Sequence, residues 1–353
     1  MEVASATRMD MQAAVGTAPV QRRKRHRLRT LAVVVPIYNE ARILDELQRR
    51  LRAVLEEIAP EWRIIYVDDG SRDGSSAMIA GFCDEDPRVT AVHLSRNFGQ
   101  QLAIAAGLDI SPADVTVLLD GDLQDPPEVI PELIEKWEAG YDVVYAVKSK
   151  RKEGLVKRFL FSLFYRILRA LSPLDIPPNA GNFSLMDRSV VELINQMPEH
   201  DRYVSGLRAY VGGRQIGVEF ERAARYAGDP RQSPLKLLRM ALDAFFAFSE
   251  LPLRIATFAG FAVSGVAFLV MLNVLYQKLV SGQAITGWAS TMTSILFLGG
   301  IQLVGLGIIG EYIGRIYNET KGRPAFIVAR YRNLPPQTDE RRPLSLAGDV
   351  SAT

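Results

Sequence analysis

The 353-residue chain is predicted to be an α/β protein with a doubly wound, mostly parallel sheet, amphipathic interface helices and a C-terminal two-helix transmembrane hairpin. Three observations predict this architecture. Short apolar runs alternate with segments of helical period. Acidic residues follow directly after several of these runs, at the ends where parallel sheets bind ligands. Two long stretches without charge lie near the C-terminus.

The apolar runs and the helical segments alternate from residue 31 onward. Residues 31–37 form a continuous apolar run, as expected for a strand that is covered on both faces. Residues 41–58 carry apolar side chains at helical spacing, with charged side chains between them. The same criteria predict strand 63–67, helix 75–82, strand 89–94, helix 99–108, strand 115–119, helix 127–139 and strand 142–147.

Charge is unevenly distributed, although the net charge of the whole chain is only +2. Residues 1–30 carry seven basic and two acidic side chains without apolar periodicity, which indicates a disordered basic arm. This arm is either a tether for anionic membrane lipid or a solvated tail. The single cysteine excludes a disulfide framework and a cysteine-based metal cage.

Two uncharged stretches are long enough to cross a membrane. They are the 23 residues between Arg254 and Lys278 and the 32 residues between Lys278 and Glu311, and a helical span needs about 20. Basic residues flank the outer ends of the hairpin, whereas its short loop holds only Lys278. Both termini are therefore expected on the cytoplasmic side of the inner membrane. The glycine-rich faces of the spans leave a homo-oligomer open.

These patterns predict the boundaries of the parts. The parts are a basic arm 1–30, an α/β domain 31–233 with an interface helix at about 155–171, an amphipathic juxtamembrane helix 234–251, transmembrane helices 252–278 and 286–312, and a cytoplasmic tail 313–353. The two amphipathic segments mix phenylalanine and leucine with basic residues, as helices in the headgroup plane do, and core-packing helices are the alternative.

The acidic residues after the strands indicate a divalent metal. Asp120 and Asp122 flank a glycine after strand 115–119, and Asp68 and Asp69 follow an earlier strand. Carboxylates at positions i and i+2 can converge on Mg²⁺ or Mn²⁺, which keeps waters and bridges to substrate phosphates. A turn with solvated acids is the alternative for the tripeptide alone. Its place after a buried strand, with a second acidic strand end upstream, favours the metal.

Four motifs in order resemble family-2 glycosyltransferases of the polyprenyl-phosphate branch, which includes dolichol-phosphate mannosyltransferase and bactoprenol-phosphate glucosyltransferases. The motifs are Val35-Pro36-Ile37-Tyr38-Asn39-Glu40, Val67-Asp68-Asp69-Gly70-Ser71-Arg72-Asp73-Gly74, Arg96-Asn97-Phe98-Gly99-Gln100 and Asp120-Gly121-Asp122-Leu123-Gln124-Asp125-Pro126-Pro127. The resemblance covers roughly residues 31–330. It implies a GT-A fold and inverting transfer of a sugar from a UDP- or GDP-sugar to a membrane polyprenyl phosphate, such as undecaprenyl phosphate, on the cytoplasmic face.

The resemblance also implies roles for particular residues. The nucleotide pocket would consist of Pro36, Tyr38, Glu40, Asp68, Asp69 and Asp120. Mg²⁺ or Mn²⁺ would be held by Asp120, Asp122 and Gln124, with Asp122 also catalytic. The anionic acceptor needs cations in order to approach an anionic donor. The candidates are Arg202, which we also expect to be catalytic, and the phosphate-binding Arg222, Arg225 and Arg231, with scattered surface arginines as the alternative.

One segment departs from the family pattern. Residues 180–185 read Ala-Gly-Asn-Phe-Ser-Leu where many relatives have Gly-Asp-Phe-Arg. Asn182 cannot act as a base, and Ser184 removes a cation. We therefore expect a catalytic role for Asn182 that consists of orienting the sugar or the acceptor phosphate by hydrogen bonds. A different donor sugar or a degenerate enzyme would each explain the departure.

Two alternative functions stay open, namely another membrane family-2 glycosyltransferase and a catalytically degenerate membrane scaffold. Retention of Asp120, Asp122 and Gln124 argues against a scaffold, which needs no metal cluster. A processive polysaccharide synthase is disfavoured because the motif Gln-x-x-Arg-Trp is absent from the chain. No nucleic-acid partner is expected.

Overall fold

The structure is a computed structural model that describes residues 28–148, 180–199, 202–220, 287–335 and scattered helical residues between 256 and 276. Several predicted features lie outside these residues. They are the basic arm up to residue 27, the interface helix at about 155–171, the juxtamembrane helix 234–251, most of the first transmembrane helix, and Arg222, Arg225 and Arg231.

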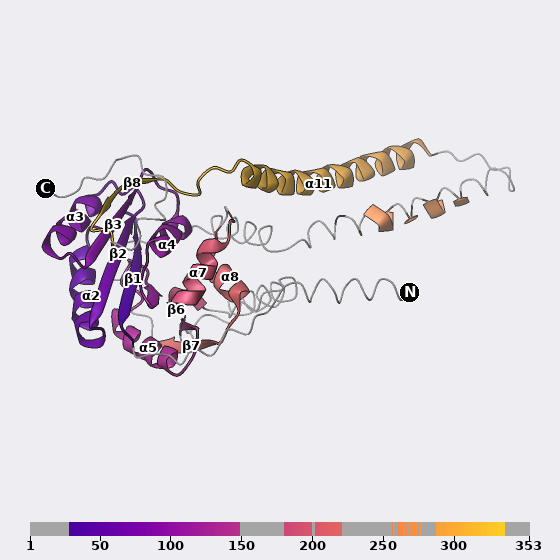
Figure 1. Cartoon of the computed structure of the whole chain (residues 1–353). Coiled ribbons are helices and arrows are strands. Elements are labelled where there is room, and N and C mark those ends of the chain that lie inside the picture. Colours follow the sequence, from indigo (N-terminus) through magenta and orange to yellow (C-terminus); the bar gives the residue numbers. More distant parts are fainter. Residues whose placement is uncertain are drawn as a thin grey trace.

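Eight strands form one sheet in the order β7-β5-β6-β4-β1-β2-β3-β8 (Figure 1). Neighbours are parallel within β4-β1-β2-β3 and between β5 and β7, whereas β6 runs antiparallel to β4 and β5, and β8 runs antiparallel to β3. The predicted, mostly parallel α/β sheet is confirmed. The strands are β1 (Thr30–Ile37), β2 (Glu61–Asp68), β3 (Val89–Leu94), β4 (Val115–Leu118), β5 (Val143–Lys148), β6 (Ala180–Asp187), β7 (Gln215–Phe220) and β8 (Val328–Arg332).

Helices cover both faces of this sheet. Successive side chains of a strand point to opposite faces, so Val33 and Val35 of β1 pack with α2, α3 and α5, while Ala32 and Val34 pack with α4, α7 and α8. Both faces are buried, which is why β1 is an unbroken apolar run. The helices are α2 (Leu44–Ile58), α3 (Ser75–Glu85), α4 (Gln100–Asp109), the 3₁₀ turn η1 (Pro127–Val129), α5 (Ile130–Glu138), α7 (Arg188–Gln196), α8 (Val204–Val211) and α11 (Trp288–Thr320).

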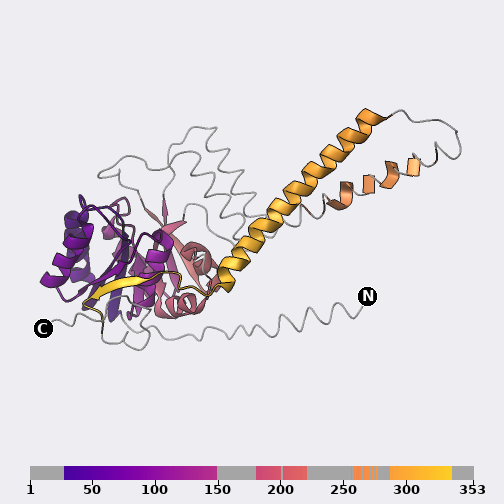
Figure 2. The ribbon, with the colours of Figure 1, turned by 90° about the horizontal axis from the view of Figure 1, so that it is seen from above.

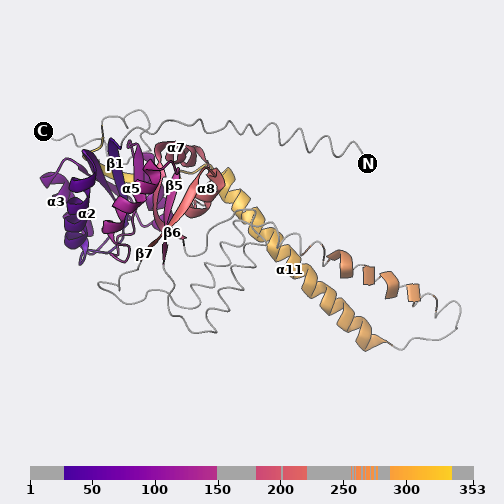
Figure 3. The same cartoon turned by 90° about the horizontal axis from the view of Figure 1, so that it is seen from below.

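The helix α11 extends away from the sheet as a single rod (Figures 2 and 3). Its 33 residues correspond to a length of about 50 Å. The part Phe297–Thr320 is long and apolar enough to cross a membrane, and within the described residues it is the one helix that is. Large apolar side chains such as Leu303 and Val304 are exposed, as they would be in lipid. The helix coincides with the second predicted span and continues past its predicted end at residue 312.

The chain returns to the sheet after α11. The strand β8 pairs antiparallel with β3, and the amide of Ser95 extends this pairing by donating to the carbonyl of Ile327 at 2.9 Å. The sequence predicts only a cytoplasmic tail at 313–353, whereas part of this segment is an edge strand of the sheet. An added strand satisfies the backbone groups that β3 would otherwise expose at the edge.

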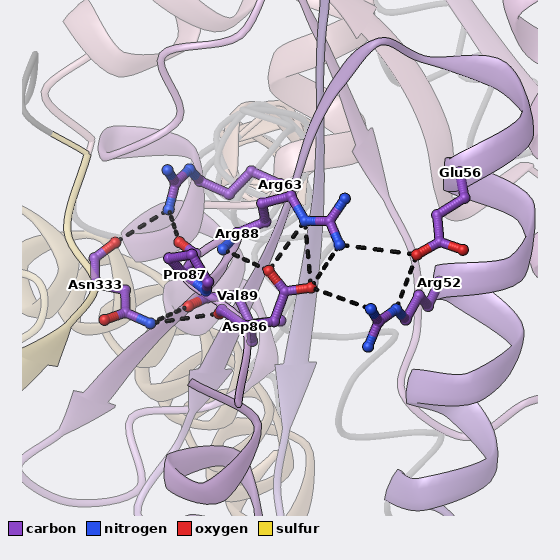
Figure 4. Close-up of polar contacts among 8 residues, drawn as sticks. All are labelled: Arg52, Glu56, Arg63, Asp86, Pro87, Arg88, Val89 and Asn333. Atoms are coloured by element: carbon purple, nitrogen blue, oxygen red, sulfur yellow. Dashed lines mark hydrogen bonds and ion pairs between the residues drawn. The ribbon is translucent and has the colours of Figure 1, made fainter. Parts of the chain in front are cut away.

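Asn333 fixes the end of β8. Its φ of 52° lies in the left-handed region, which asparagine tolerates better than most residues. Its side-chain Nδ2 donates to the carbonyl oxygen of Cys83 at 2.6 Å. Nδ2 also donates to the carbonyl oxygen of Val89 at 3.0 Å, and the carbonyl of Asn333 accepts from Arg63 Nη1 at 3.1 Å (Figure 4). One residue therefore joins the end of β8 to the loop between α3 and β3.

Replacement of Asn333 by alanine should destabilise this junction. Alanine removes the amide donor and is strained at positive φ, so we expect a loss of about 1 kcal/mol, which corresponds to about 2–4 °C in the unfolding midpoint. Thermal unfolding of the detergent-solubilised chain measures the shift. Asn333→Gly loses the donor without the strain and should lie between alanine and wild type. Equal midpoints for all three proteins would contradict the role of Asn333.

Candidate active site

The carboxyl ends of β4, β1 and β2 lie side by side and carry most of the predicted site residues. The strand β1 pairs in parallel with both of its neighbours. Beyond the end of the ladder, the backbone amide of Asp69 donates to the carbonyl of Ile37 at 2.9 Å. Segments 38–40, 68–71 and 119–124 therefore meet at one edge of the sheet, which is the ligand-binding edge in folds of this kind.

The loops that follow β1 and β2 are interlocked by hydrogen bonds. The amide of Asn39 donates to Ser71 Oγ at 3.0 Å, and the amide of Arg72 donates back to Asn39 Oδ1 at 2.8 Å. The amide of Glu40 donates to Ser75 Oγ, also at 3.0 Å. Each loop thus supplies acceptors for the backbone of the other, and the two form one unit at the edge of the sheet.

Asp69 holds the loop that follows β3. Its Oδ1 accepts from the amide of Phe98 at 2.7 Å, and its Oδ2 accepts from the amide of Gly99 at 2.9 Å. The residue is 2% exposed. Burial raises the pKa of this carboxyl, although the two amide hydrogen bonds act in the opposite direction. Both carboxylate oxygens therefore contact the main chain of the protein, while the expected contact of Asp69 with the nucleotide stays a prediction.

Asp68 has a different set of partners. Its Oδ1 accepts from the amide of Ser71 at 2.9 Å, and its Oδ2 lies 3.0 Å from Nδ1 of His93 on β3. Burial by itself would raise the pKa of Asp68, but the hydrogen bonds from His93 and Ser71 outweigh it and lower the pKa. The carboxylate form is therefore favoured at the end of β2, close to the interlocked loops.

The Asp120-Gly121-Asp122 segment follows β4 and packs against β1. A Cβ atom on Gly121 would lie 2.5 Å from Cδ1 of Ile37 and 3.0 Å from the carbonyl oxygen of Pro36, so a larger residue would displace the Ile37 side chain or the segment itself. The carboxylate of Asp122 accepts through Oδ1 from the amide of Gln124 at 3.1 Å. The glycine thus places the two carboxylates directly beside the end of β1.

The first turn of α4 contacts this segment through two glutamines. Gln100 Nε2 donates to Asp120 Oδ1 at 2.8 Å. Gln101 Nε2 donates to Asn182 Oδ1 at 3.2 Å, and its Oε1 accepts from the amide of Val204 at 2.9 Å. Asn182 Nδ2 in turn lies 3.4 Å from Asp120 Oδ1. The structure therefore brings Asn182 on β6 to the carboxylates after β4.

The donor atoms at this edge fit a divalent cation. No group of three or more His, Cys, Asp or Glu residues with metal-binding geometry occurs among the described residues. Asp120 and Asp122 supply two carboxylates, both partly exposed, and the buried Gln124 follows on the same segment. A hard cation such as Mg²⁺ is usually bound through one or two carboxylates together with substrate phosphates, and these residues match that donor set.

The remaining predicted residues are distributed as follows. Pro36 is the penultimate residue of β1. Tyr38 follows the last residue of this strand and is 38% exposed at the same end of the sheet. Arg202 donates through Nη2 to the carbonyl of Met197 at 2.9 Å, just beyond the C-terminus of α7. Its catalytic role stays a prediction.

Three residues that contribute to this site were given no site role from the sequence. Gln100 and Gln101 begin α4 and contact Asp120 and Asn182; Gln100 is the last residue of the Arg96–Gln100 motif, and Gln101 follows it directly. His93 lies within the predicted strand 89–94 and is 3% exposed. Its contact with Asp68 depends on strand register, which the sequence does not state.

Sequence profiles and relatives identify the family. The profile of glycosyl transferase family 2 matches residues 32–194, and that of the GtrB C-terminal hairpin matches residues 251–316. The uncharacterized glycosyltransferase YkcC of Bacillus subtilis is 44% identical over 300 residues, which are 85% of this chain and 93% of the relative. The chain belongs to glycosyltransferase family 2. The resemblance seen in the motifs is thereby confirmed, and the chain is a glycosyltransferase.

Other relatives of this glycosyltransferase carry a more specific name. The prophage bactoprenol glucosyl transferase homolog of Escherichia coli is 42% identical, over 86% of this chain and 99% of the relative. The bactoprenol glucosyl transferase of Shigella phage SfV is 41% identical, over 84% and 97%. Among solved structures, the mannosyltransferase PcManGT of Pyrobaculum calidifontis with GDP-Man and Mn²⁺ is 19% identical, over 84% of this chain and 92% of that chain, with a TM-score of 0.41. This likeness is too low to indicate ligands.

A pair of glycine variants tests the packing of the loops. Gly70 and Gly74 both have positive φ, but a Cβ on Gly70 would lie 2.7 Å from the backbone of Arg96, whereas a Cβ on Gly74 has nothing within 4 Å. Gly74→Ala should cost only the strain of about 1–2 kcal/mol. Gly70→Ala should lower the unfolding midpoint further and reduce transfer activity at least ~10-fold, because it displaces the 96–99 loop. Equal effects of the two variants would contradict this packing.

Proposed function

We propose that the chain transfers a sugar, glucose in the first instance, from a nucleotide-diphosphate donor to a polyprenyl phosphate in the membrane. The observation that carries the proposal is the combination of an acidic site at the ends of β4, β1 and β2 with a long apolar helix that returns to the same sheet through β8. Relatives named bactoprenol glucosyl transferases, about 40% identical over most of the chain, support this acceptor and this sugar.

The donor would bind across the ends of the strands. Tyr38 and Glu40 follow β1, and Asp68 presents a carboxylate whose pKa is lowered by its hydrogen bonds. Asp120, Asp122 and Gln124 would hold Mg²⁺ or Mn²⁺ against the donor diphosphate. The cation neutralises the negative charge that develops on the leaving nucleoside diphosphate.

The acceptor requires less assistance than a sugar hydroxyl would. A phosphate monoester is already anionic at neutral pH, so its oxygen can attack the anomeric carbon without first losing a proton to a base. The bond from that carbon to the nucleotide diphosphate breaks as the new bond forms, which inverts the configuration. Asn182 beside Asp120 would orient the reacting groups by hydrogen bonds, and this role suits a residue that cannot act as a base.

The membrane part would bring this site to the acceptor. The GtrB C-terminal hairpin covers residues 251–316, and α11 lies largely within it. The charges at the two ends of the hairpin support a position in the inner membrane with both termini in the cytoplasm. The basic residues of the first 30 positions would add attraction to anionic lipid. The glycines of α11 would permit helix contacts in a homo-oligomer.

The proposal is tested with the purified full chain, undecaprenyl phosphate and a panel of labelled UDP- and GDP-sugars, each with Mg²⁺, Mn²⁺ or EDTA. We expect a lipid-linked sugar that forms only with a divalent cation. Asp122→Asn should reduce the rate at least ~100-fold with an unchanged unfolding midpoint, whereas Asp45→Asn, an exposed carboxylate on α2, should stay within about twofold of wild type.

Other outcomes are equally informative. Wild-type rates for Asp122→Asn would refute the assignment of the metal to this carboxylate. Absence of product with every sugar nucleotide would refute the transfer reaction. Product on a soluble acceptor alone would favour a different family-2 activity.

A further inference from the structure

Three polar residues lie side by side on three neighbouring strands, at the end of the sheet where the sugar-nucleotide donor is proposed to bind. Asp68 of β2 is in register with His93 of β3, and His93 is in register with Arg330 of β8. Ser76 at the start of α3 joins the row, because its Oγ lies 3.0 Å from His93 Nδ1 and 3.4 Å from Arg330 Nη2. A continuous set of contacts therefore links Asp68 to the strand that follows the membrane helix.

The position of the His93 ring shows which groups its two nitrogens contact. The side chain is buried at 3% exposure, and Nδ1 lies 3.0 Å from Asp68 Oδ2. A carboxylate only accepts hydrogen bonds, so Nδ1 carries the proton and donates it. The other ring nitrogen, Nε2, has no partner among the described residues. The Nδ1–H group therefore lies between two acceptors, Asp68 Oδ2 and Ser76 Oγ, each 3.0 Å away, and the charged carboxylate is the stronger acceptor.

A buried histidine at position 93 lowers the stability of the fold relative to an apolar residue. The neighbours of His93 in β3 include Val89, Ala91, Val92 and Leu94, all buried, and an apolar side chain would fit there without leaving a buried ring nitrogen unpaired. The Asp68 carboxylate has four lone-pair positions, of which Ser71 uses two, through its amide and its side chain, and His93 uses one. Asp68 is thereby held in one rotamer and retains acceptor capacity for a ligand hydroxyl or N–H group.

We propose that His93 and Ser76 are positioning residues for the donor nucleotide: they orient the Asp68 carboxylate, and β8 completes the row through Arg330. This inference rests on the proposed function, in which Asp68 contacts the nucleotide. Its consequence is that β8, the strand that follows the membrane helix, contributes to donor affinity through Arg330, which is linked to Asp68 by way of Ser76 and His93. Loss of the His93 contact is expected to weaken donor binding and to leave the rate of the chemical step unchanged.

Two substitutions of His93 separate positioning from stability. His93→Val keeps a strand-forming apolar residue and removes the donor, whereas His93→Asn retains an N–H group close to the place of Nδ1. Calorimetry of the full chain with UDP and with GDP, each with Mn²⁺, measures affinity. We expect His93→Val to weaken binding of the preferred nucleotide about tenfold and to raise the donor KM equally at unchanged kcat. His93→Asn should recover most of the loss.

Three further measurements complete the test. Val92→Ala creates a cavity beside the same strand. This variant should lower the unfolding midpoint and leave nucleotide affinity unchanged. Arg330→Ala should weaken binding about threefold, and no change would remove β8 from the proposal. If wild type binds nucleotide and His93→Val binds it equally well, the positioning role is refuted and the proposed function stands. If wild type binds neither UDP nor GDP, the proposed function fails, and the positioning role fails with it.

Discussion

The site depends on one buried carboxylate, that of Asp69. Its two oxygens accept hydrogen bonds from successive amides of the 96–99 loop, and this fixes where α4 begins. The first two residues of α4 then contact the carboxylate of Asp120 and the amide of Asn182. A side chain at the end of β2 thus determines positions after β4 and on β6. Burial raises the pKa of this carboxyl, and the two amide hydrogen bonds oppose that shift.

The adjacent residues Asp68 and Asp69 differ in their hydrogen-bond partners and therefore in their roles. Asp68 is one residue from Asp69, yet its pKa is lowered where that of Asp69 is raised. The hydrogen bonds from His93 and from the side chain and amide of Ser71 together outweigh the burial of Asp68. Asp69 organises the protein, and Asp68 keeps accepting capacity for a ligand. The membrane helix is integrated into the same framework, since β8 completes the sheet beside β3. A catalytic sheet and a membrane anchor therefore share one hydrogen-bonded ladder.

Much of this could be predicted from the sequence, because local patterns determine it. The strands 31–37 and 89–94 and the helix at 41–58 were recognised by period, and the acidic strand ends by their position after apolar runs. The strand β8 was not predicted. It is only five residues long, and its sequence does not indicate that it pairs with β3. The different hydrogen-bond partners of Asp68 and Asp69 could not be predicted either, since both residues follow the same strand. Register and loop contacts, rather than residue type, distinguish them.

Hydrogen–deuterium exchange on Asp69→Asn tests the central claim most directly. An asparagine can accept from only one of the two amides and turns its own N–H group towards the other. We predict that peptides covering residues 96–104 exchange about tenfold faster than in wild type, and that peptides covering 119–126 follow, because α4 no longer holds Asp120. Asp45→Asn should change neither peptide. Unchanged protection of both segments in Asp69→Asn, or faster exchange of 96–104 alone, would contradict the account.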